Sequence, residues 1–342
     1  MKRPPVTYAT VCSGIEAMSV AADPLGWRPV FFSEVAPFAS AVLAHHYPHV
    51  PNLGDMLKIK GSDYAGKITV LAGGTPCQAF SAAGLRKGLA DPRGGLTLAF
   101  ARLAFESRAE WLLWENVPGV LSQGKGRSFA ALLSALTRQR VTPPERGWLN
   151  SGACAGGAEG YSVCWRVLDA QFTRASGYPD AVPQRRRRVW LVGHLGTDWR
   201  HPAGVLFDGA VDPQYSPPHG SHTPPPSPGG DAGHHPPISL SGNLAFHRQH
   251  LRSFAPAWQY RVAQTVTCTD VHVLVTPDGV RRFTPVEEER LFGFPDNYTA
   301  IRYRGAPATP YARHNVLGNS WAVNCARWVC ERIGMSIAGT LQ

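Results

Sequence analysis

Short apolar runs alternate with segments of helical spacing along the first third of the chain. The runs are rich in Val, Phe, Leu and Trp, which is typical of buried strands. We expect strands at 8–12, 29–33, 67–72, 111–114 and 188–192, and helices at 16–22, 37–46 and 96–107. Strands that alternate with helices predict a parallel sheet covered on both faces, with ligands bound at the carboxyl ends of its strands.

The pattern changes in the second half of the chain. Residues 212–237 consist largely of Pro, Gly, Ser and His, a composition that cannot build a core and that predicts a mobile loop or linker. Organised structure is expected to resume with a strand at 271–275, a turn at 277–279 and a helix at 286–291. A closing helix is expected at 321–333.

The composition favours a nucleic-acid partner. The 342-residue chain carries 34 Lys and Arg against 24 Asp and Glu, a net charge of +10, and 44% of its residues are hydrophobic. This length suggests two domains, or one large domain with an insertion. The positive charge favours a polyanion, although a basic surface without a partner is the alternative.

The cysteines and the apolar runs indicate the cellular setting. Seven cysteines occur without a C-x-x-C pair or zinc-site spacing, so we expect free thiols in a reducing cytosol and no bound metal. The sequence has no signal-peptide pattern and no apolar run of membrane length. A soluble cytoplasmic protein with no membrane partner is therefore expected.

Three segments carry candidate chemistry at predicted strand ends. Cys77 lies in GGTPCQ, where glycines allow a sharp turn and proline stiffens the approach; it is either a nucleophile or an inert buried thiol. Glu115 follows an apolar run directly and is either a proton donor or a surface acid. The arginines at 185–188 either hold phosphates and a base carbonyl or form a solvated patch.

In combination, these segments resemble the C5-cytosine-specific DNA methyltransferase family. The resemblance covers most of the chain outside the middle loop, and its blocks follow the family's order. The matching segments are TVCSGIEA (10–17), the acids Glu34 and Asp55, TPCQAFSAAG (75–84), DPRGGL (91–96), ENV (115–117), VPQRRRRVWLVG (182–193), RRFTPVEEERLFGFPDNYT (281–299) and LGNSWAV (317–323).

The resemblance implies an α/β fold, with a Rossmann-like S-adenosylmethionine-dependent methyltransferase domain and a small target-recognition domain. The catalytic, cofactor-binding domain would comprise residues 1–194 and 311–342. The target-recognition domain would comprise residues 195–310, including the flexible segment 212–237. The chain departs from the family pattern where Glu16 replaces a second glycine, in the longer stretch 173–181, and in a short recognition region.

The resemblance also assigns site residues. The expected catalytic residues are Cys77, Glu115, Arg186 and Arg188. The expected cofactor-binding residues are Cys12, Ser13, Gly14, Ile15, Glu34, Val35, Asp55, Met56, Gly74, Pro76, Leu96, Asn319 and Ser320. The expected DNA-binding residues are Gln78, Ser81, Arg86, Lys87, Arg93, Gln184 and Arg185.

The implied reaction transfers a methyl group from S-adenosyl-L-methionine to C5 of a cytosine flipped out of double-stranded DNA, and it leaves S-adenosyl-L-homocysteine. Cys77 would attack the base covalently, as a thiolate can near neutral pH. A monomer is expected, and a cognate restriction endonuclease is a possible partner. The alternatives are an RNA cytosine-5 methyltransferase of the same fold and an inactive DNA-binding relative.

Overall fold

The computed structural model describes residues 4–76, 95–207, 244–247, 259–260, 262–263, 265–268, 272–276 and 279–341. The segment 212–237, predicted to be a mobile linker, and the candidate nucleophile Cys77 lie outside these residues.

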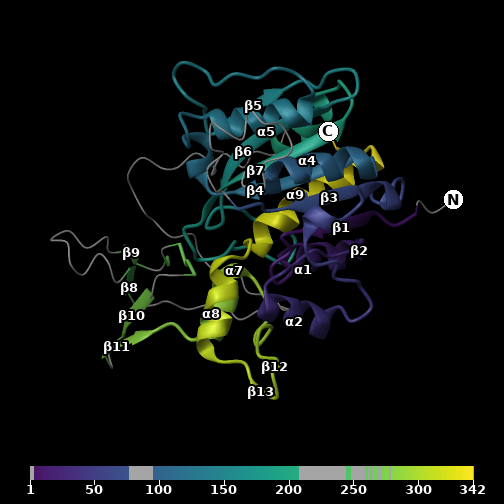
Figure 1. The fold of residues 1–342 in the computed structure, drawn as a ribbon. Helices are drawn as coiled ribbons and strands as arrows, with labels where there is room; N and C mark the ends of the chain where they lie inside the picture. The colour runs from purple at the N-terminus through teal and green to yellow at the C-terminus, as the bar shows by residue number, and fades with distance from the viewer. Residues whose placement is uncertain are drawn as a thin grey trace.

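A seven-stranded sheet with the order β2-β1-β3-β4-β7-β6-β5 forms the centre of the molecule (Figure 1). Its strands are β1 (Thr7–Val11), β2 (Arg28–Phe31), β3 (Val70–Gly73), β4 (Trp111–Asn116), β5 (Ser151–Cys154), β6 (Tyr161–Asp169) and β7 (Arg187–Leu195). The five strands expected in this part of the chain are all present, with ends shifted by a few residues.

The prediction of a parallel sheet is wrong for half of this sheet. Strands β2, β1, β3 and β4 are parallel, whereas β7 runs antiparallel to β4 and to β6, and β5 runs antiparallel to β6. A parallel connection between β6 and β7 would need a crossover, which is usually a helix. Residues 170–186, which join these two strands, contain no helix. The start of β7 therefore lies beside the carboxyl end of β4.

Helices cover both faces of the sheet, and adjacent side chains of β4 show why. Trp111 and Leu113 belong to the apolar cluster that includes α1, α6 and α9, whereas Leu112 and Trp114 belong to the cluster that includes α4 and α5. The helices are α1 (Ala17–Ala22), α2 (Pro37–His46), α4 (Gly95–Ser107), α5 (Arg127–Thr137), α6 (Arg200–Phe207), α7 (Pro285–Phe292), α8 (Pro310–Gly318) and α9 (Val323–Ala338), with 3-10 turns η1 (Asp23–Leu25), η2 (Met56–Lys58), η3 (Gly61–Tyr64) and η5 (Pro118–Leu121). The five helices expected from the sequence are confirmed within a few residues at each end, except that α9 extends to Ala338.

A smaller four-stranded sheet with the order β11-β10-β8-β9 lies apart from the central sheet, on the side of α7 and α8 (Figure 1). It comprises β8 (Leu244–His247), β9 (Gln259–Tyr260), β10 (His272–Thr276) and β11 (Gly279–Arg282), and a further pair is formed by β12 (Arg302–Tyr303) and β13 (Ala306–Pro307). All these strands lie within residues 195–310, the range predicted for target recognition. The exact domain boundaries stay a prediction.

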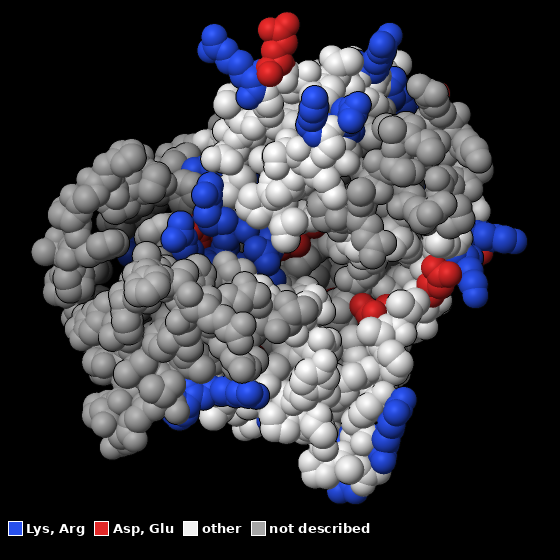
Figure 2. Space-filling model, turned by 60° about the vertical axis from the view of Figure 1, so that its left-hand side comes forward, with Lys and Arg blue, Asp and Glu red and all other residues white. Residues whose placement is uncertain are grey.

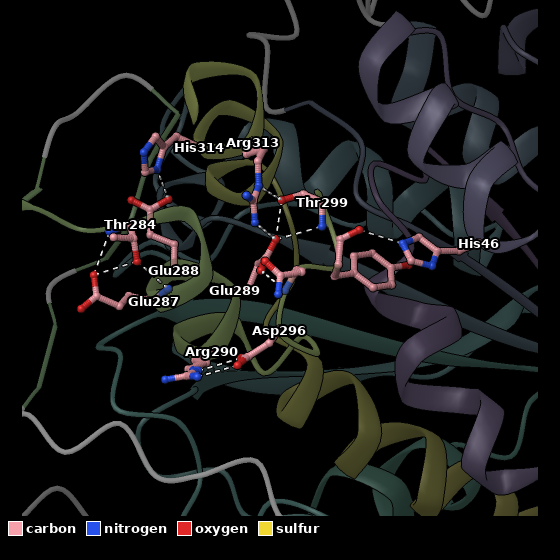
Figure 3. Close-up of polar contacts among 12 residues, drawn as sticks. His46, Thr284, Glu287, Glu288, Glu289, Arg290, Asp296, Thr299, Arg313 and His314 are labelled. Carbon is pink, nitrogen blue, oxygen red and sulfur yellow. Dashed lines mark hydrogen bonds and ion pairs between the residues drawn. The ribbon is translucent and has the colours of Figure 1, made fainter. Parts of the chain in front are cut away.

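Polar contacts fix α7 and the segment that follows it (Figure 3). Thr284 and Glu287 form a capping box at the start of α7. The buried Glu289 carboxylate accepts hydrogen bonds from the Thr299 backbone N–H at 2.8 Å and from Arg313 of α8 at 2.8 Å. His46 of α2 stacks on Tyr298, with ring centroids 3.9 Å apart. Helix α7 thus contacts α8 directly, and the segment that follows α7 contacts α2.

Candidate active site

The loop after β1 has an unusual backbone. Cys12, Gly14 and Glu16 all have left-handed φ values, of 51°, 56° and 63°. Such values are unfavourable for residues other than glycine, so contacts must hold the loop. One is the Gly14 backbone N–H, which donates to Glu34 Oε2 at 2.7 Å. Another is the Ser33 backbone N–H, which donates to Ser13 Oγ at 2.9 Å.

Glu34 follows β2 and is fixed by backbone amides. Besides the Gly14 bond, its Oε1 atom accepts from the backbone N–H groups of Val35 at 2.8 Å and Ala36 at 2.7 Å. The neighbouring Val35 side chain is 70% exposed. The carboxylate therefore has one orientation beside residues 12–16, the loop that is expected to bind the cofactor (hereafter the cofactor loop). This orientation suits a residue that accepts hydrogen bonds from ribose hydroxyls.

Asp55 and Met56 approach the loop from η2. Asp55 caps η2 by accepting from the Leu57 backbone N–H at 3.0 Å, and Met56 is buried with its sulfur 3.7 Å from the Cys12 sulfur. Burial, followed by the nearby carboxylates of Glu34 and Asp55, raises the pKa of the Cys12 thiol to about 12. Cys12 is therefore a neutral packing residue at physiological pH.

The side chain of Glu16, the residue that replaces a glycine of the family pattern, points inward. It caps the start of α1. Its fully buried carboxylate accepts hydrogen bonds from Thr10 Oγ1, from Ser19 Oγ and, at 3.2 Å, from the Ser19 backbone N–H. Ser19 Oγ in turn accepts from Tyr8 Oη at 2.7 Å. Burial raises the pKa of Glu16 to about 7, even though these hydrogen bonds oppose the rise.

The carboxyl end of β3 leads toward the candidate nucleophile. Thr75 Oγ1 accepts from Trp114 Nε1 at 3.0 Å, and the Thr75 carbonyl accepts from Asn116 Nδ2 at 2.8 Å. A side chain at Gly74 would meet Trp321 Nε1 at 2.8 Å from its Cβ, so only glycine fits there. Side chains from β4 and from the segment after α8 thus fix the chain up to Pro76.

Glu115 and Arg188 meet at the same edge of the sheet. The antiparallel register pairs Glu115 with Trp190, which brings the start of β7 to the end of β4. Arg188 Nε lies 3.1 Å from Glu115 Oε1, and the two side chains are 13% and 9% exposed. Burial raises the pKa of Glu115, while Arg188 and Arg186 partly oppose that rise. Burial thus makes this carboxyl easier to protonate than an exposed one.

Arg186, predicted as catalytic, is committed to backbone carbonyls. It is 2% exposed and donates to the carbonyls of Val266 at 3.0 Å, Gly318 at 3.3 Å and Ser320 at 2.6 Å. Burial lowers the pKa of its guanidinium to about 9. Arg186 therefore supports the segment that carries Asn319 and Ser320. The arginine that contacts Glu115 is instead Arg188.

Burial alternates along residues 184–188. Gln184 is fully buried and neither atom of its side-chain amide has a hydrogen-bond partner, whereas Arg185 and Arg187 are exposed. Figure 2 shows Lys and Arg side chains gathered at one side of a hollow, with acidic side chains beside them. The DNA contacts predicted for Gln184 and Arg185 stay a prediction.

Several of these residues line a small cavity of about 60 Å³. It is lined by the predicted cofactor residues Cys12, Ser13, Gly14, Gly74, Asn319 and Ser320, and also by Thr10, Val11, Glu16, Ala17, Met18, Gly73, Glu115 and Trp321. Sequence reasoning missed Thr10 and Trp321, although both lie inside matched blocks and could have been included.

The other predicted site residues lie outside this cavity or outside the described residues. Ile15 is fully buried and its carbonyl accepts from Tyr298 Oη at 2.9 Å, Leu96 packs near the start of α4, and Pro76 is exposed. Outside the described residues lie Cys77, Gln78, Ser81, Arg86, Lys87 and Arg93. In the described ranges, no group of three or more His, Cys, Asp or Glu side chains is arranged to hold a metal ion.

Comparison with known proteins decides the family. The sequence model of the C-5 cytosine-specific DNA methylase family matches residues 6–139, the stretch that contains the cofactor loop, Glu34, Gly74 and Glu115. Residues 6–139 belong to the C-5 cytosine-specific DNA methylase family.

Curated relatives extend the match beyond residues 6–139. A protein of Escherichia phage P1 named DNA N-6-adenine-methyltransferase is 44% identical over 236 residues, 59% of this chain. The Type II methyltransferase M2.BsuMI of Bacillus subtilis is 26% identical over 337 residues, 94% of this chain. The chain spans only 30% of the length of the phage protein and 73% of the length of the Bacillus protein.

Solved structures share the fold of this chain over nearly all of its length. A protein described as a DNA modification methyltransferase encoded within an E. coli prophage aligns with a TM-score of 0.62 at 17% identity, covering 97% of this chain and 99% of that chain. The Dnmt2 methyltransferase of S. pombe aligns with a TM-score of 0.57 at 15% identity, covering 97% and 98%. The fold is Rossmann-like, as in these solved structures. No helix within the described residues is both long enough and apolar enough to span a membrane.

Proposed function

We propose that this chain is an S-adenosylmethionine-dependent DNA (cytosine-5)-methyltransferase. The observation that carries the proposal is the buried Glu115–Arg188 pair, which lies at the carboxyl end of β4. Glu115 lines the same cavity as the cofactor loop and Gly74. Cys77, the proposed nucleophile, follows Gly74 by three positions in the sequence.

The residues present fit this cofactor. Glu34 is held by three backbone N–H groups and would accept hydrogen bonds from the ribose hydroxyls. Asp55 would accept from the adenine amino group, and Asn319 and Ser320 would line the methionine end. When bound, S-adenosylmethionine supplies an electrophilic methyl group on its sulfonium.

Glu115 and Arg188 would recognise and activate the cytosine. A protonated Glu115 donates to N3 and accepts from the exocyclic N4, which neutralises the negative charge that develops on the ring. Arg188, already ordered by Glu115, donates to O2. General acid catalysis of this type contributes about 10²- to 10⁴-fold in rate.

Cys77 would supply the nucleophile. Its thiolate forms a bond to C6 of the cytosine, which breaks the aromatic C5–C6 double bond and makes C5 electron-rich. After C5 is methylated, a base removes the C5 proton, and the electron pair re-forms the double bond as the thiolate leaves. The enzyme thus returns to its starting state.

Double-stranded DNA is the proposed substrate. The base must leave the stack to reach the site, at a cost of a few kcal/mol. Contacts from Arg185 and from the predicted loop residues Gln78, Ser81, Arg86, Lys87 and Arg93 to phosphates would offset this cost. The relatives include proteins named Type II methyltransferases, which supports a cognate restriction endonuclease as a further partner. We propose a monomeric enzyme.

A second candidate is methylation of the adenine N6 amino group, because the phage P1 relative carries that name. The chain spans 30% of the phage protein. The name of the phage protein can therefore refer to an activity of the larger part, which this chain does not match. The methylase family match at residues 6–139 favours cytosine C5. The RNA alternative shares the chemistry and differs only in the substrate.

The test is transfer of a labelled methyl group from S-adenosylmethionine to matched deoxy- and ribo-oligonucleotides. Label in duplex DNA that is lost in Cys77→Ser supports the proposal. Label only in RNA would replace DNA as the substrate. If the wild type binds the cofactor and labels neither, the inactive DNA-binding alternative is correct.

A further inference from the structure

Glu16 lines the proposed cofactor cavity, and its carboxylate is buried next to that cavity without a positively charged partner. It is fully buried and lines the cavity together with Cys12, Gly14 and Glu115. The groups that donate to it are neutral, namely the hydroxyls of Thr10 and Ser19 and the Ser19 backbone N–H. Within the described residues, no Lys, Arg or His forms an ion pair with Glu16, although such a residue would normally accompany a buried charge.

The other carboxylate of the cavity is already compensated. Glu115 lies 3.1 Å from Arg188 Nε. Burial of an unpaired carboxylate is unfavourable, which agrees with the rise in the pKa of Glu16 to about 7. A cationic occupant of the cavity would offset this charge. The loop itself is held by the same carboxylate, so the charge cannot move away without breaking the cap of α1.

We propose that Glu16 makes the cavity select the sulfonium-bearing cofactor over its thioether product, S-adenosyl-L-homocysteine. The inference rests on the proposed function, which gives the cavity this occupant. The two ligands differ by one methyl group and one positive charge, so shape barely distinguishes them. A fixed anion in a low-dielectric wall favours the cation, and the preference is lost once transfer has neutralised the sulfur. Glu16 is thus a specificity-determining residue that promotes product release.

The experiment is isothermal titration calorimetry at pH 8.5, where a carboxyl with a pKa of about 7 is ionised. The ligands are S-adenosylmethionine, S-adenosylhomocysteine and sinefungin, an analogue with an amine-bearing carbon in place of the sulfonium. In Glu16→Gln the ratio of product Kd to cofactor Kd should fall about tenfold, equal to ~1.4 kcal/mol. Sinefungin should weaken together with the cofactor.

Two further variants separate charge from structure. Ser19→Ala removes the two hydrogen bonds of the Ser19 hydroxyl, to Glu16 and from Tyr8, and keeps the carboxylate, so its Kd ratio should match the wild type even if its stability falls. Glu16→Gly removes the charge in a residue that favours the observed φ of 63°, and it serves if Glu16→Gln does not fold.

A Kd ratio that stays within about twofold of the wild type in both charge-removing variants would overturn the inference and leave the proposed function standing. Equal weakening of all three ligands would overturn it too, since that is the result of a purely structural role. A wild-type protein that binds none of the ligands would overturn the proposed function, and the inference with it.

Discussion

Replacing the buried Glu16 by glutamine should change how the stability of the protein depends on pH. The carboxyl has an ordinary pKa of 4.5 and a folded-state pKa of about 7, because burial disfavours its charged form. Between these values the folded protein holds a proton that the unfolded chain has released. The stability that this group contributes is therefore greatest below pH 4.5, falls as pH rises, and levels off above pH 7.

The size of the effect follows from the two pKa values. Ionising such a group in the folded state costs about 3 kcal/mol over the whole window, of which roughly 2 kcal/mol falls between pH 5.5 and 8. Glutamine cannot ionise, so Glu16→Gln removes this pH dependence whatever its effect on stability at one pH. The free energy of unfolding of the wild type, relative to the variant, should thus fall by about 2 kcal/mol from pH 5.5 to 8.

Urea denaturation followed by tryptophan fluorescence, at a series of pH values for both proteins, measures this difference. Glu145→Gln is the matched control, because Glu145 is exposed and its replacement should leave the pH dependence nearly as in the wild type. Curves for wild type and Glu16→Gln that stay parallel within about 0.5 kcal/mol would refute the reasoning. They would show that Glu16 is ionised in the folded protein throughout this range, as it is in the unfolded chain.

Four further predictions concern the site. Cys77→Ser should lose turnover but keep cofactor binding, as measured by calorimetry. Turnover of this variant at the wild-type rate would show that Cys77 is not the nucleophile. Glu115→Gln should slow methylation by about 10² or more, and a loss below about threefold in single-turnover assays would argue against an acid role. Arg186→Met should lower the free energy of unfolding by about 3 kcal/mol in urea, because three carbonyls lose their donor; a loss under about 1 kcal/mol would contradict that role. DNA binding should weaken steeply with salt in fluorescence anisotropy, and a flat response would leave the basic charge unexplained.

The order of strands and helices in the first part of the chain was predictable, because apolar runs and helical spacing are local signals. The direction of β7 was not, since an antiparallel strand and a parallel strand carry the same apolar pattern. Strand β6 and helix α5 were missed as well. That direction matters for function, because it is what brings Arg188 to Glu115.

The sequence supplied candidate site residues, but it did not show which contacts each of them makes. Both Arg186 and Arg188 lie in one arginine run, and only the fold separates the buried guanidinium that binds backbone carbonyls from the one beside Glu115. Glu16 was visible as a departure from the family pattern. Its inward orientation depends on Thr10 and Ser19, which are brought together only when β1 and α1 pack.

The most direct test of the central claim is the chemical identity of the methylated base. Duplex DNA incubated with the protein and S-adenosylmethionine would be digested to nucleosides and separated by liquid chromatography with mass detection. The account predicts 5-methyldeoxycytidine that is absent with Cys77→Ser. N6-methyldeoxyadenosine in its place would contradict the account and assign to this chain the activity that the name of its phage P1 relative states.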